Sequence, residues 1–199
     1  MSRFIETICF EKGAYSLLPE HQLRVNRAFE AHYPEAAPHQ LTTLLPALSF
    51  DERYKVRVVY DAELTEVEFS QYTLRPLRRI QLVRNDSISY GFKSENRKAL
   101  TRLFAQRGSA DEILIVKKGA VTDGYYANVA FWDGAAWWTP KTYLLNGVRR
   151  QHLLNTGKIR EKMIREDDLR SFEKVSLINA MVDLGESELP VSEIHGINS

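Results

Sequence analysis

The chain has 199 residues, 44% of them hydrophobic and 27% charged, as is typical of a soluble globular protein with one large domain or two small ones. The 27 Lys and Arg residues nearly balance the 26 Asp and Glu residues, and a net charge of +1 argues against nucleic acid or membrane binding by charge. Cys9 is the single cysteine and no apolar run reaches the length of a membrane span or signal peptide, so we expect a cytoplasmic protein.

The first elements along the chain predict a hairpin and a helix. The stretch "FIETICFEKGAYSLL" reads as two short strands around a Lys12–Gly13 turn, because glycine supplies the positive φ that a tight hairpin needs. The segment "PEHQLRVNRAFEAHYP" follows and predicts a helix between its two prolines. Leu23, Ala28 and Phe29 would form its apolar face.

The next elements are a second helix, expected over residues 38–48, and a group of strands. The stretches "RYKVRVVYDAELTEVEFSQYTLRPL" and "RRIQLVRNDSISYGF" alternate with a period of two and are separated by Pro76. We therefore expect a small α+β domain over residues 1–84, with a linker near residues 84–90.

The rest of the chain, residues 85–199, predicts a larger domain that is mostly sheet. A helix should follow "GFK", run to about Gln106 and stop at Gly108. A meander with turns at Lys118–Gly119 and Asp133–Gly134 comes next. "NGVRRQHLLNTG" then predicts a short helix and "KVSLINAMVDL" an apolar strand, so the chain as a whole is expected to be α+β.

Lys93, in "ISYGFKSENRKAL", is the first candidate for chemistry. It follows a strand-like run over residues 88–92 and should lie in the first helical turn, on one face with Asn96 and Leu100. A lysine there opposes the helix dipole, and an apolar setting would lower the pKa of its amine towards Schiff-base chemistry. The alternative is that Lys93 is a solvated lysine and Asn96 a surface residue.

A second candidate is an anion site in "LLNGVRRQHLL". Arg149 and Arg150 would fall in the first turn of a helix, where the positive end of the dipole opposes them. Free backbone N–H groups after Gly147 could bind a phosphate there. Alternatively, the two arginines point to solvent and pair with Asp or Glu.

The third candidate is Asp123 in "AVTDGYYANVAFW". A carboxylate at the end of a sheet could hold a protonated ring nitrogen, although Asp123–Gly124 also reads as an ordinary turn. An amine, an anion site and a carboxylate together are what pyridoxal 5′-phosphate (PLP) requires.

Over nearly its whole length, the chain resembles the class IV aminotransferases of PLP fold type IV (the D-amino acid aminotransferase-like fold). "FIETICFEKGAYSLLPEHQLRVNRAF" is similar to the opening strand pair and H-x-x-R helix of that family, here His21 and Arg24. "FKSENR" resembles the lysine motif K-x-x-N-R of 4-amino-4-deoxychorismate lyases. "VTDGYYANVAFW", "LLNGVRR" and "LINAMVDL" resemble the T-E-x-x-x-x-N segment, the phosphate loop and the lyase segment C-N-A-L-M-P-V.

The resemblance implies a role for each matching residue. Lys93 would be the catalytic Schiff-base lysine and Asp123 the acid at the pyridine nitrogen. The implied cofactor-binding residues are Arg24, Lys93, Asn96, Asp123, Gly147, Val148 and Arg149. No metal site is expected.

Three departures from the family pattern accompany the match. Asp123 replaces the usual Glu, and Arg149 stands where a phosphate-binding Thr is common. The chain also begins at a segment that a strand and a Gly-rich turn precede in relatives, so we expect two small α/β-type domains truncated at the N-terminus.

The implied activity is that of a PLP-dependent lyase of the 4-amino-4-deoxychorismate lyase type, forming 4-aminobenzoate and pyruvate from a small-molecule amine. The alternatives are an aminotransferase acting on branched-chain or D-amino acids and a non-catalytic PLP-binding relative. Family members are homodimers, so a homodimer is expected, with neither nucleic acid nor membrane as a partner. Candidate substrate-binding residues are Tyr54, Arg57, Arg75, Asn179, Ala180 and Met181.

Overall fold

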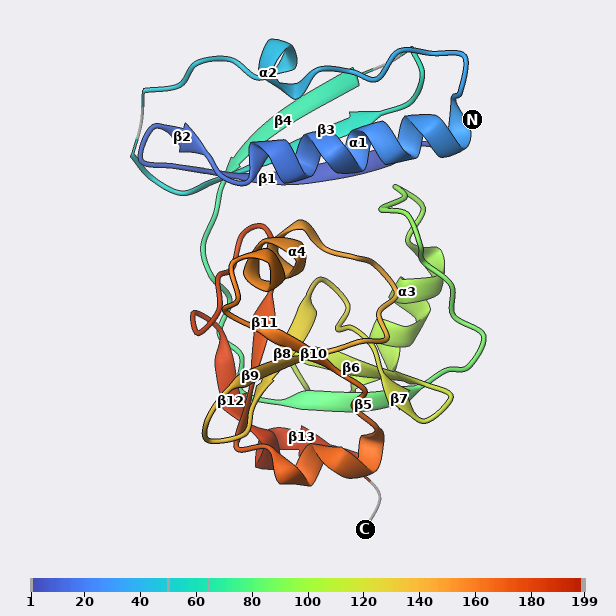
Figure 1. Ribbon diagram of the computed structural model, residues 1–199, viewed down its shortest axis with the longest axis vertical. Coiled ribbons are helices and arrows are strands. Elements are labelled where there is room, and N and C mark those ends of the chain that lie inside the picture. The colour runs from blue at the N-terminus through green and yellow to red at the C-terminus, as the bar shows by residue number, and fades with distance from the viewer. Residues whose placement is uncertain (1, 50, 64, 198–199) are drawn as a thin grey trace. The chain divides into compact units, whose positions relative to one another are not determined.

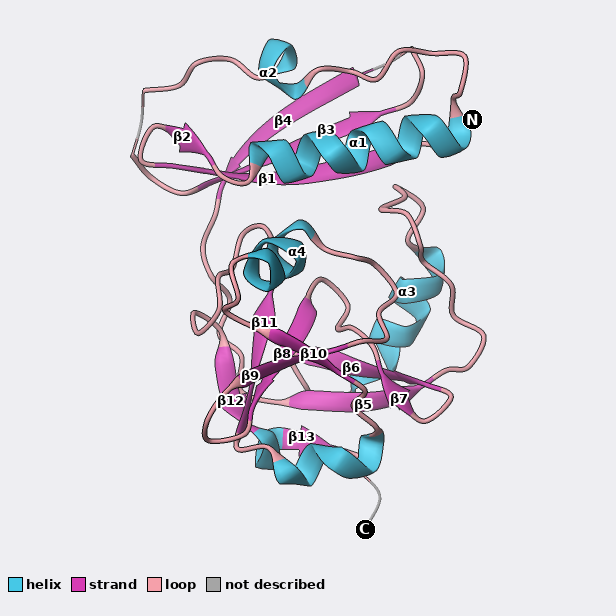
Figure 2. Ribbon diagram, viewed as in Figure 1, coloured by secondary structure: helices cyan, strands magenta, loops and turns pink. Residues whose placement is uncertain are grey.

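A computed structural model describes residues 2–49, 51–63 and 65–197 (Figure 1). The chain forms two compact units, the first comprising residues up to 74 together with residues 92–96, and the second comprising residues 75–91 and the chain from 97 onwards. Residues 75–84, which precede the expected boundary, group with the second unit because Ile80–Arg84 pairs with a strand of that unit. The α+β class expected from the sequence is confirmed (Figure 2).

The first unit is a four-stranded antiparallel sheet with the order β2-β1-β3-β4. Its strands are β1 (Phe4–Glu11), β2 (Ala14–Tyr15), β3 (Tyr54–Tyr60) and β4 (Thr65–Gln71). The predicted hairpin is confirmed: Lys12 and Gly13 connect β1 to β2 with φ values of 52° and 75°. Both values lie in the left-handed region that a two-residue hairpin turn requires.

Helix α1 (Leu18–His32) covers one face of this sheet (Figure 1). It ends before Pro34, as predicted, because the residue preceding a proline avoids helical geometry. Phe29 is 1% exposed and Ala28 2%, and both lie in the core, whereas Leu23 is 54% exposed and its predicted place on the apolar face was wrong.

Only one helical turn, α2 (Leu41–Leu44), forms in the region where a helix over residues 38–48 was predicted. Gln22 of α1 explains part of this arrangement. Its side-chain amide accepts a hydrogen bond from Leu41 N (2.8 Å) and donates one to His39 O (2.9 Å), so the loop is held by side-chain contacts rather than by helical hydrogen bonds.

The second unit contains two sheets. One has the order β13-β5-β6-β7, formed by β5 (Ile80–Arg84), β6 (Glu112–Lys117), β7 (Ala120–Val121) and β13 (Ile194–His195). The other has the order β10-β9-β8-β11-β12, formed by β8 (Asn128–Trp132), β9 (Trp137–Pro140), β10 (Arg160–Lys162), β11 (Lys174–Ile178) and β12 (Glu188–Pro190).

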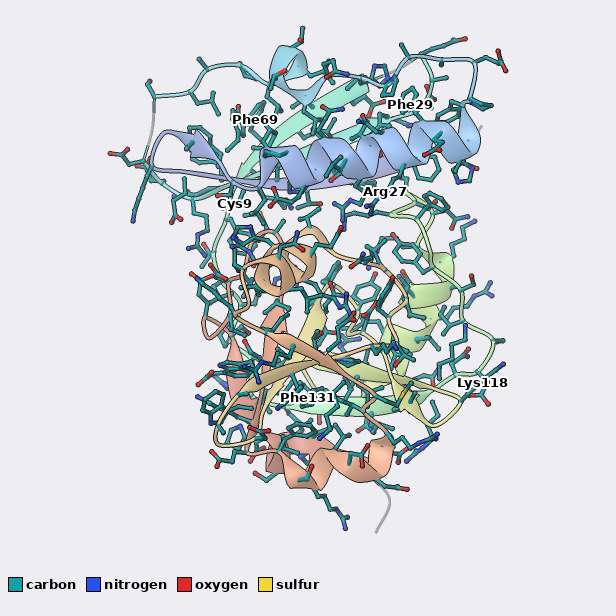
Figure 3. All side chains as sticks on the ribbon, in the orientation of Figure 1. Cys9, Arg27, Phe29, Phe69, Lys118 and Phe131 are labelled. Atoms are coloured by element: carbon teal, nitrogen blue, oxygen red, sulfur yellow. The ribbon has the colours of Figure 1, made fainter. Side chains whose placement is uncertain are left out.

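One buried cluster joins the two sheets of the second unit. It includes Leu114 of β6 and Phe131 of β8, each with 0% exposure (Phe131 is marked in Figure 3). The helices of this unit are α3 (Lys98–Phe104) and α4 (Val148–Asn155), with 3₁₀ turns η1 (Ala105–Arg107), η2 (Glu166–Ser171) and η3 (Val191–Glu193). The predicted short helix and the predicted apolar strand, α4 and β11, are confirmed.

The region before α3 differs from its prediction. Residues 88–92 do not form a strand, since Asn85 Oδ1 accepts hydrogen bonds from the backbone N–H groups of Ser87 (3.1 Å) and Ile88 (2.7 Å) and turns the chain. Helix α3 begins only at Lys98, so the prediction that Lys93 lies in a first helical turn was wrong. A common helical face for Lys93, Asn96 and Leu100 is wrong for the same reason.

Across the part of the chain that the structure describes, no helix is both long and apolar enough to cross a membrane. The longest, α1, has 15 residues.

Candidate functional site

Lys93 lies in a non-helical segment, residues 92–96, that belongs to the first unit and bends at Phe92 and Glu95. Ile5 N donates a hydrogen bond to Lys93 O (2.9 Å), and Ser94 forms an antiparallel bridge with Phe4. The backbone of Lys93 is therefore fixed along the edge of β1 by hydrogen bonds rather than by a helix.

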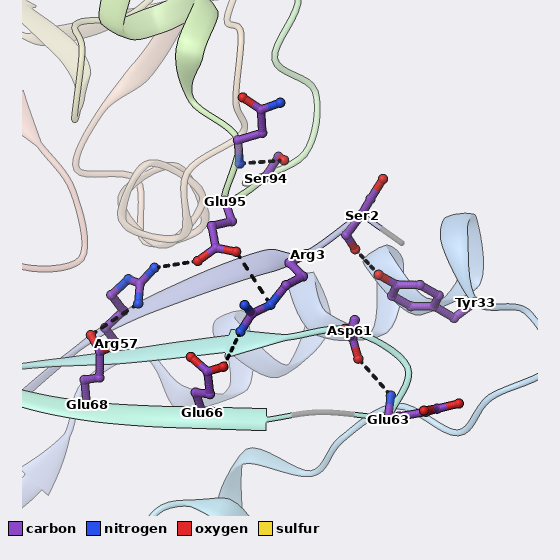
Figure 4. Close-up of polar contacts among 11 residues, drawn as sticks. Ser2, Arg3, Tyr33, Arg57, Asp61, Glu63, Glu66, Glu68, Ser94 and Glu95 are labelled. Carbon is purple, nitrogen blue, oxygen red and sulfur yellow. Dashed lines mark hydrogen bonds and ion pairs between the residues drawn. The ribbon is translucent and has the colours of Figure 1, made fainter.

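Glu95 anchors the same segment through charge (Figure 4). Its carboxylate pairs with Arg57 Nη2 at 3.1 Å and with Arg3 Nε at 3.5 Å, and its N–H donates to Arg3 O (2.9 Å). Arg57 also pairs with Glu68 at 3.2 Å. The structure thus places Arg57, a predicted substrate-binding residue, in a network that holds the Lys93 segment on the sheet.

Arg24 lies on α1 and forms a bidentate ion pair with Glu6 of β1. Arg24 Nε donates to Glu6 Oε1 (2.8 Å) and Arg24 Nη2 to Glu6 Oε2 (2.5 Å), and His21 Nδ1 makes a short hydrogen bond to the same Oε2. Glu6 and His21 are both 0% exposed. Sequence reasoning did not single out Glu6, although a Glu at a core-facing position of an apolar strand was a signal that could have found it.

The charges of this network are well defined. Burial alone would raise the pKa of Glu6, but the charge of Arg24 and the hydrogen bond from His21 outweigh it and lower that pKa to about 2. Burial lowers the pKa of His21, with Lys93 among the nearby cations that act in the same direction. At neutral pH, Glu6 is therefore ionised and His21 is neutral.

Two other predicted residues, Asn96 and Tyr54, also lie in the first unit. Asn96 is exposed, and its N–H donates to Ser94 Oγ (3.1 Å). Tyr54 begins β3 and packs against the apolar core beneath α1.

In the second unit, Asp123 is a buried acid rather than an exposed turn residue, with 5% exposure. Asp123 Oδ1 accepts a hydrogen bond from Asn128 Nδ2 (2.8 Å), and Oδ2 accepts from Leu144 N and Leu145 N, each at 2.9 Å. All of these donors are uncharged N–H groups. Burial raises the pKa of the Asp123 carboxyl to about 6, although these hydrogen bonds act to lower it.

Asn128, which sequence reasoning quoted only as part of a motif, links Asp123 to the loop before α4. Its Nδ2 also donates to Leu145 O (2.9 Å), and its Oδ1 lies so close to Gly147 that a Cβ there would overlap it. The acid and the start of α4 are therefore built as one hydrogen-bonded structure. The five-residue spacing of the family motif was the signal for Asn128.

Helix α4 begins at Val148 after Gly147, as the sequence predicted. The N–H groups of its first turn have no acceptor within the helix, and the dipole makes this end positive. Arg149 pairs with Asp183 at 3.0 Å, and Arg150 pairs with Glu161 at 2.6 Å. Both arginines therefore pair with acids, as the alternative interpretation held, but Arg150 is 2% exposed and does not point to solvent.

The segment 179–181 lies beside Asn128, because Ile178 at the end of β11 pairs with Asn128 at the start of β8. Asn179 Oδ1 accepts a hydrogen bond from Met181 N (2.8 Å), and its Nδ2 donates to Tyr126 O (3.4 Å). Ala180 is half-buried between them. This end of the second unit thus gathers the predicted residues Asp123, Gly147–Arg149 and Asn179–Met181.

Arg75 and Arg97 also lie in the second unit. Arg75 is exposed and is close enough to act on the pKa of Tyr126. Arg97 precedes α3, donates to Tyr125 O (2.5 Å) and Tyr90 Oη (3.1 Å), and has its guanidinium 5.2 Å from the centre of the Tyr126 ring. The final arginine of the "KSENR" motif thus orders the loop that follows Asp123.

The raised pKa of Asp123 predicts a pH-dependent stability in the absence of cofactor. A carboxyl whose pKa is higher in the folded than in the unfolded chain contributes stability below about pH 4 that is lost as the pH rises through about 6. The free energy of unfolding of the wild type, minus that of D123N, should fall by about 3 kcal/mol between pH 4 and pH 7. Urea unfolding of both proteins between pH 4 and pH 7 measures this difference. A difference that does not change with pH would contradict the raised pKa of Asp123.

The close contact between Gly147 and Asn128 predicts that adding a methyl group at residue 147 destabilises the protein. Gly147→Ala should lower the free energy of unfolding by about 1–3 kcal/mol, because the new Cβ overlaps Asn128 Oδ1 and forces the loop to move. Gly91→Ala is the control, since a Cβ at Gly91 meets nothing within 4 Å. Equal urea midpoints for the two variants would contradict the packing.

The family model for class IV aminotransferases matches residues 3–194. A Haemophilus influenzae protein described only as uncharacterized is 37% identical over 185 residues, which cover 91% of this chain and 98% of that protein. A candidate aminodeoxychorismate lyase of Schizosaccharomyces pombe is 36% identical over 88 residues, which cover 41% of this chain and 38% of that protein.

Among solved structures, a candidate 4-amino-4-deoxychorismate lyase from Haemophilus somnus superposes with a TM-score of 0.88 at 29% identity. The match covers 92% of this chain and 98% of that one.

Proposed function

Since the chain belongs to the class IV aminotransferase family of PLP-dependent enzymes, we propose that it binds PLP and acts as a lyase of the 4-amino-4-deoxychorismate lyase type. The proposed substrate is a small-molecule amine, and the products are 4-aminobenzoate and pyruvate. We further propose that it works as a homodimer in the cytoplasm.

The observation that carries the proposal is the buried Asp123. Among the described residues its hydrogen bonds come from the neutral donors Asn128 Nδ2, Leu144 N and Leu145 N, and the charge of Arg150 acts on it as a smaller effect than these hydrogen bonds. A buried carboxylate is costly without a cationic partner, and a protonated pyridine nitrogen would supply one. The same hydrogen-bonded structure continues to Gly147 and the positive end of α4, which suits a phosphate. The residues present therefore fit a cationic ring that carries a phosphate group.

Each residue has a proposed part in holding the cofactor. Lys93 Nζ would attach to it covalently, and Asp123 would keep the proton on its pyridine nitrogen. Arg24 and the backbone N–H groups of Val148 and Arg149 would bind its phosphate, with Gly147 permitting the close approach of Asn128. The side chain of Arg149, which pairs with Asp183, would serve to fix the start of α4.

PLP, when bound, supplies an electron sink for the negative charge that develops at the substrate carbon. In the reaction, Lys93 would act as a general base: its Nζ would accept the proton from that substrate carbon. In an aminotransferase, Lys93 would deliver this proton to a carbon of the cofactor, whereas in a lyase the bond to the side chain breaks instead. Asp123, whose raised pKa a facing cation would lower, would hold the ring nitrogen protonated throughout.

The lyase is preferred because "KSENR" and "NAM" are similar to the lyase forms of their motifs, and because two of the relatives named above carry lyase descriptions. The second candidate is an aminotransferase acting on branched-chain or D-amino acids, since Arg57 and Arg75 could bind a substrate carboxylate. A non-catalytic PLP-binding relative is the third.

Two assays run in parallel on the PLP-loaded protein decide among the three. Pyruvate release from aminodeoxychorismate, measured with a coupled dehydrogenase, supports the lyase. Exchange of amino groups between amino acids and keto acids supports the aminotransferase, and inactivity in both assays with PLP bound supports the third.

A further inference from the structure

The most unusual feature outside the residues assigned above is the pair Glu6 and His21. Both side chains are fully buried within the first unit, between β1 and α1. Glu6 lies on the face of β1 that also carries Phe4 and Ile8, and these two belong to the apolar core. An apolar residue would fill this position at lower cost in solvation, so the acid requires an explanation.

The hydrogen bonds of Glu6 fix the plane of the Arg24 guanidinium. The carboxylate engages Nε and Nη2 side by side, at 2.8 Å and 2.5 Å. This is the fork geometry in which an arginine has little freedom to rotate. Because the guanidinium is planar, the pairing also turns Nη1 away from Glu6.

His21 holds the carboxylate in turn. It lies one helical turn before Arg24, and its Nδ1 donates to Glu6 Oε2, the oxygen that also receives Arg24 Nη2. Its Nε2 is buried and has no hydrogen-bond partner among the described residues. A buried imidazole nitrogen without a hydrogen bond loses its contact with water and gains nothing in return. The hydrogen bond from Nδ1 to Glu6 is therefore the polar contact that explains a buried histidine at this position.

We propose that Glu6 and His21 are positioning residues that hold the Arg24 guanidinium as a rigid, pre-oriented receptor for the phosphate of PLP. This rests on the proposed function, in which Arg24 binds that phosphate. His21 fixes Glu6, Glu6 fixes Arg24, and neither Glu6 nor His21 contacts the cofactor. Rigidity matters because an arginine that is already oriented loses less side-chain entropy when it binds an anion.

The test compares two ligands that differ only in the phosphate, namely PLP and pyridoxal. Their dissociation constants are measured by tryptophan fluorescence for the wild type and for E6Q, R24A, H21F and H21N. E6Q should weaken PLP binding by roughly 10–100-fold, as is typical when the partner that orients a ligand-binding residue is lost, and should change pyridoxal binding much less. H21F should act in the same direction, whereas H21N, whose amide can donate at the position of Nδ1, should restore the wild-type ratio of the two constants.

The variants separate positioning from a general effect on folding. A merely structural role would change both ligands equally and leave the ratio constant. E6Q in the R24A background should have no further effect on the ratio, because both act through one group. Should E6Q fail to fold, H21F and H21N decide, since both retain the Glu6–Arg24 ion pair.

The outcomes also separate this inference from the function it rests on. If the wild type binds PLP no more tightly than pyridoxal, the phosphate site and this inference both fail. If the wild type prefers PLP but E6Q, or the H21F and H21N pair, leaves that preference unchanged, only the inference fails.

Discussion

Lys93→Ala is expected to reduce turnover by roughly 10⁴-fold or more, because the variant loses both the covalent attachment of the cofactor and the general base. The fold should be retained. The Lys93 segment is held by its backbone, through the bond from Ile5 N to Lys93 O, and by the ion pairs of Glu95. Steady-state rates with whichever substrate the parallel assays identify measure the effect.

Lys98→Ala is the matched control for this prediction. Lys98 is an exposed lysine five residues further along the same stretch, at the start of α3. It should keep the wild-type rate and the wild-type urea midpoint. Wild-type turnover in Lys93→Ala would refute the assignment of the catalytic lysine.

Asp123→Asn should lower the rate of proton abstraction by roughly 100-fold or more, because a neutral amide cannot keep the pyridine nitrogen protonated. Covalent attachment of the cofactor to Lys93 should persist, since it does not need that proton. Single-turnover absorbance measurements separate the two steps.

Asp133→Asn is a stringent control, because Asp133 also precedes a glycine and fits the alternative that was considered for Asp123. Asp133 is an exposed turn residue whose carboxylate accepts hydrogen bonds from Ala135 N, Ala136 N and Trp138 Nε1. Asp133→Asn should leave the abstraction rate unchanged. If the two variants behave alike, Asp123 does no more than shape its loop.

The two Asp-Gly pairs illustrate what a local pattern can predict. Asp-Gly correctly predicts a change of chain direction near both positions, because glycine and aspartate favour turns through their own short-range geometry. The burial of Asp123 depends on Asn128, five residues further on, and on the loop at residues 144–145, which is 21–22 residues away in sequence. The position of Asp123 at the end of a sheet and the family motif, rather than the turn pattern, suggested an acid with a function.

The segment around Lys93 illustrates the opposite case. Its helical spacing was read correctly from Leu100 onwards, but the helix was extended too far towards Lys93. Glu95 holds residues 92–96 on the first unit by pairing with Arg3 and Arg57. No periodicity within the segment encodes these contacts with residues distant in sequence. The helical turn predicted around Lys93 was therefore wrong, while its role as the Schiff-base lysine stays a prediction.

Glu6, His21 and Asn128 show a third limit. Each is a polar residue whose importance comes from its burial against one partner, and burial is set by tertiary packing. In the sequence, Glu6 was one charge in the apolar run "FIETICF", and His21 entered only as the first letter of a motif.

The most direct test of PLP binding through Lys93 is borohydride reduction of the protein loaded with PLP, followed by peptide mapping with mass spectrometry. The cofactor should be fixed to the peptide that contains Lys93, at close to one label per chain. Label on a different lysine, or no label after reduction, would contradict the claim that this protein binds PLP through Lys93.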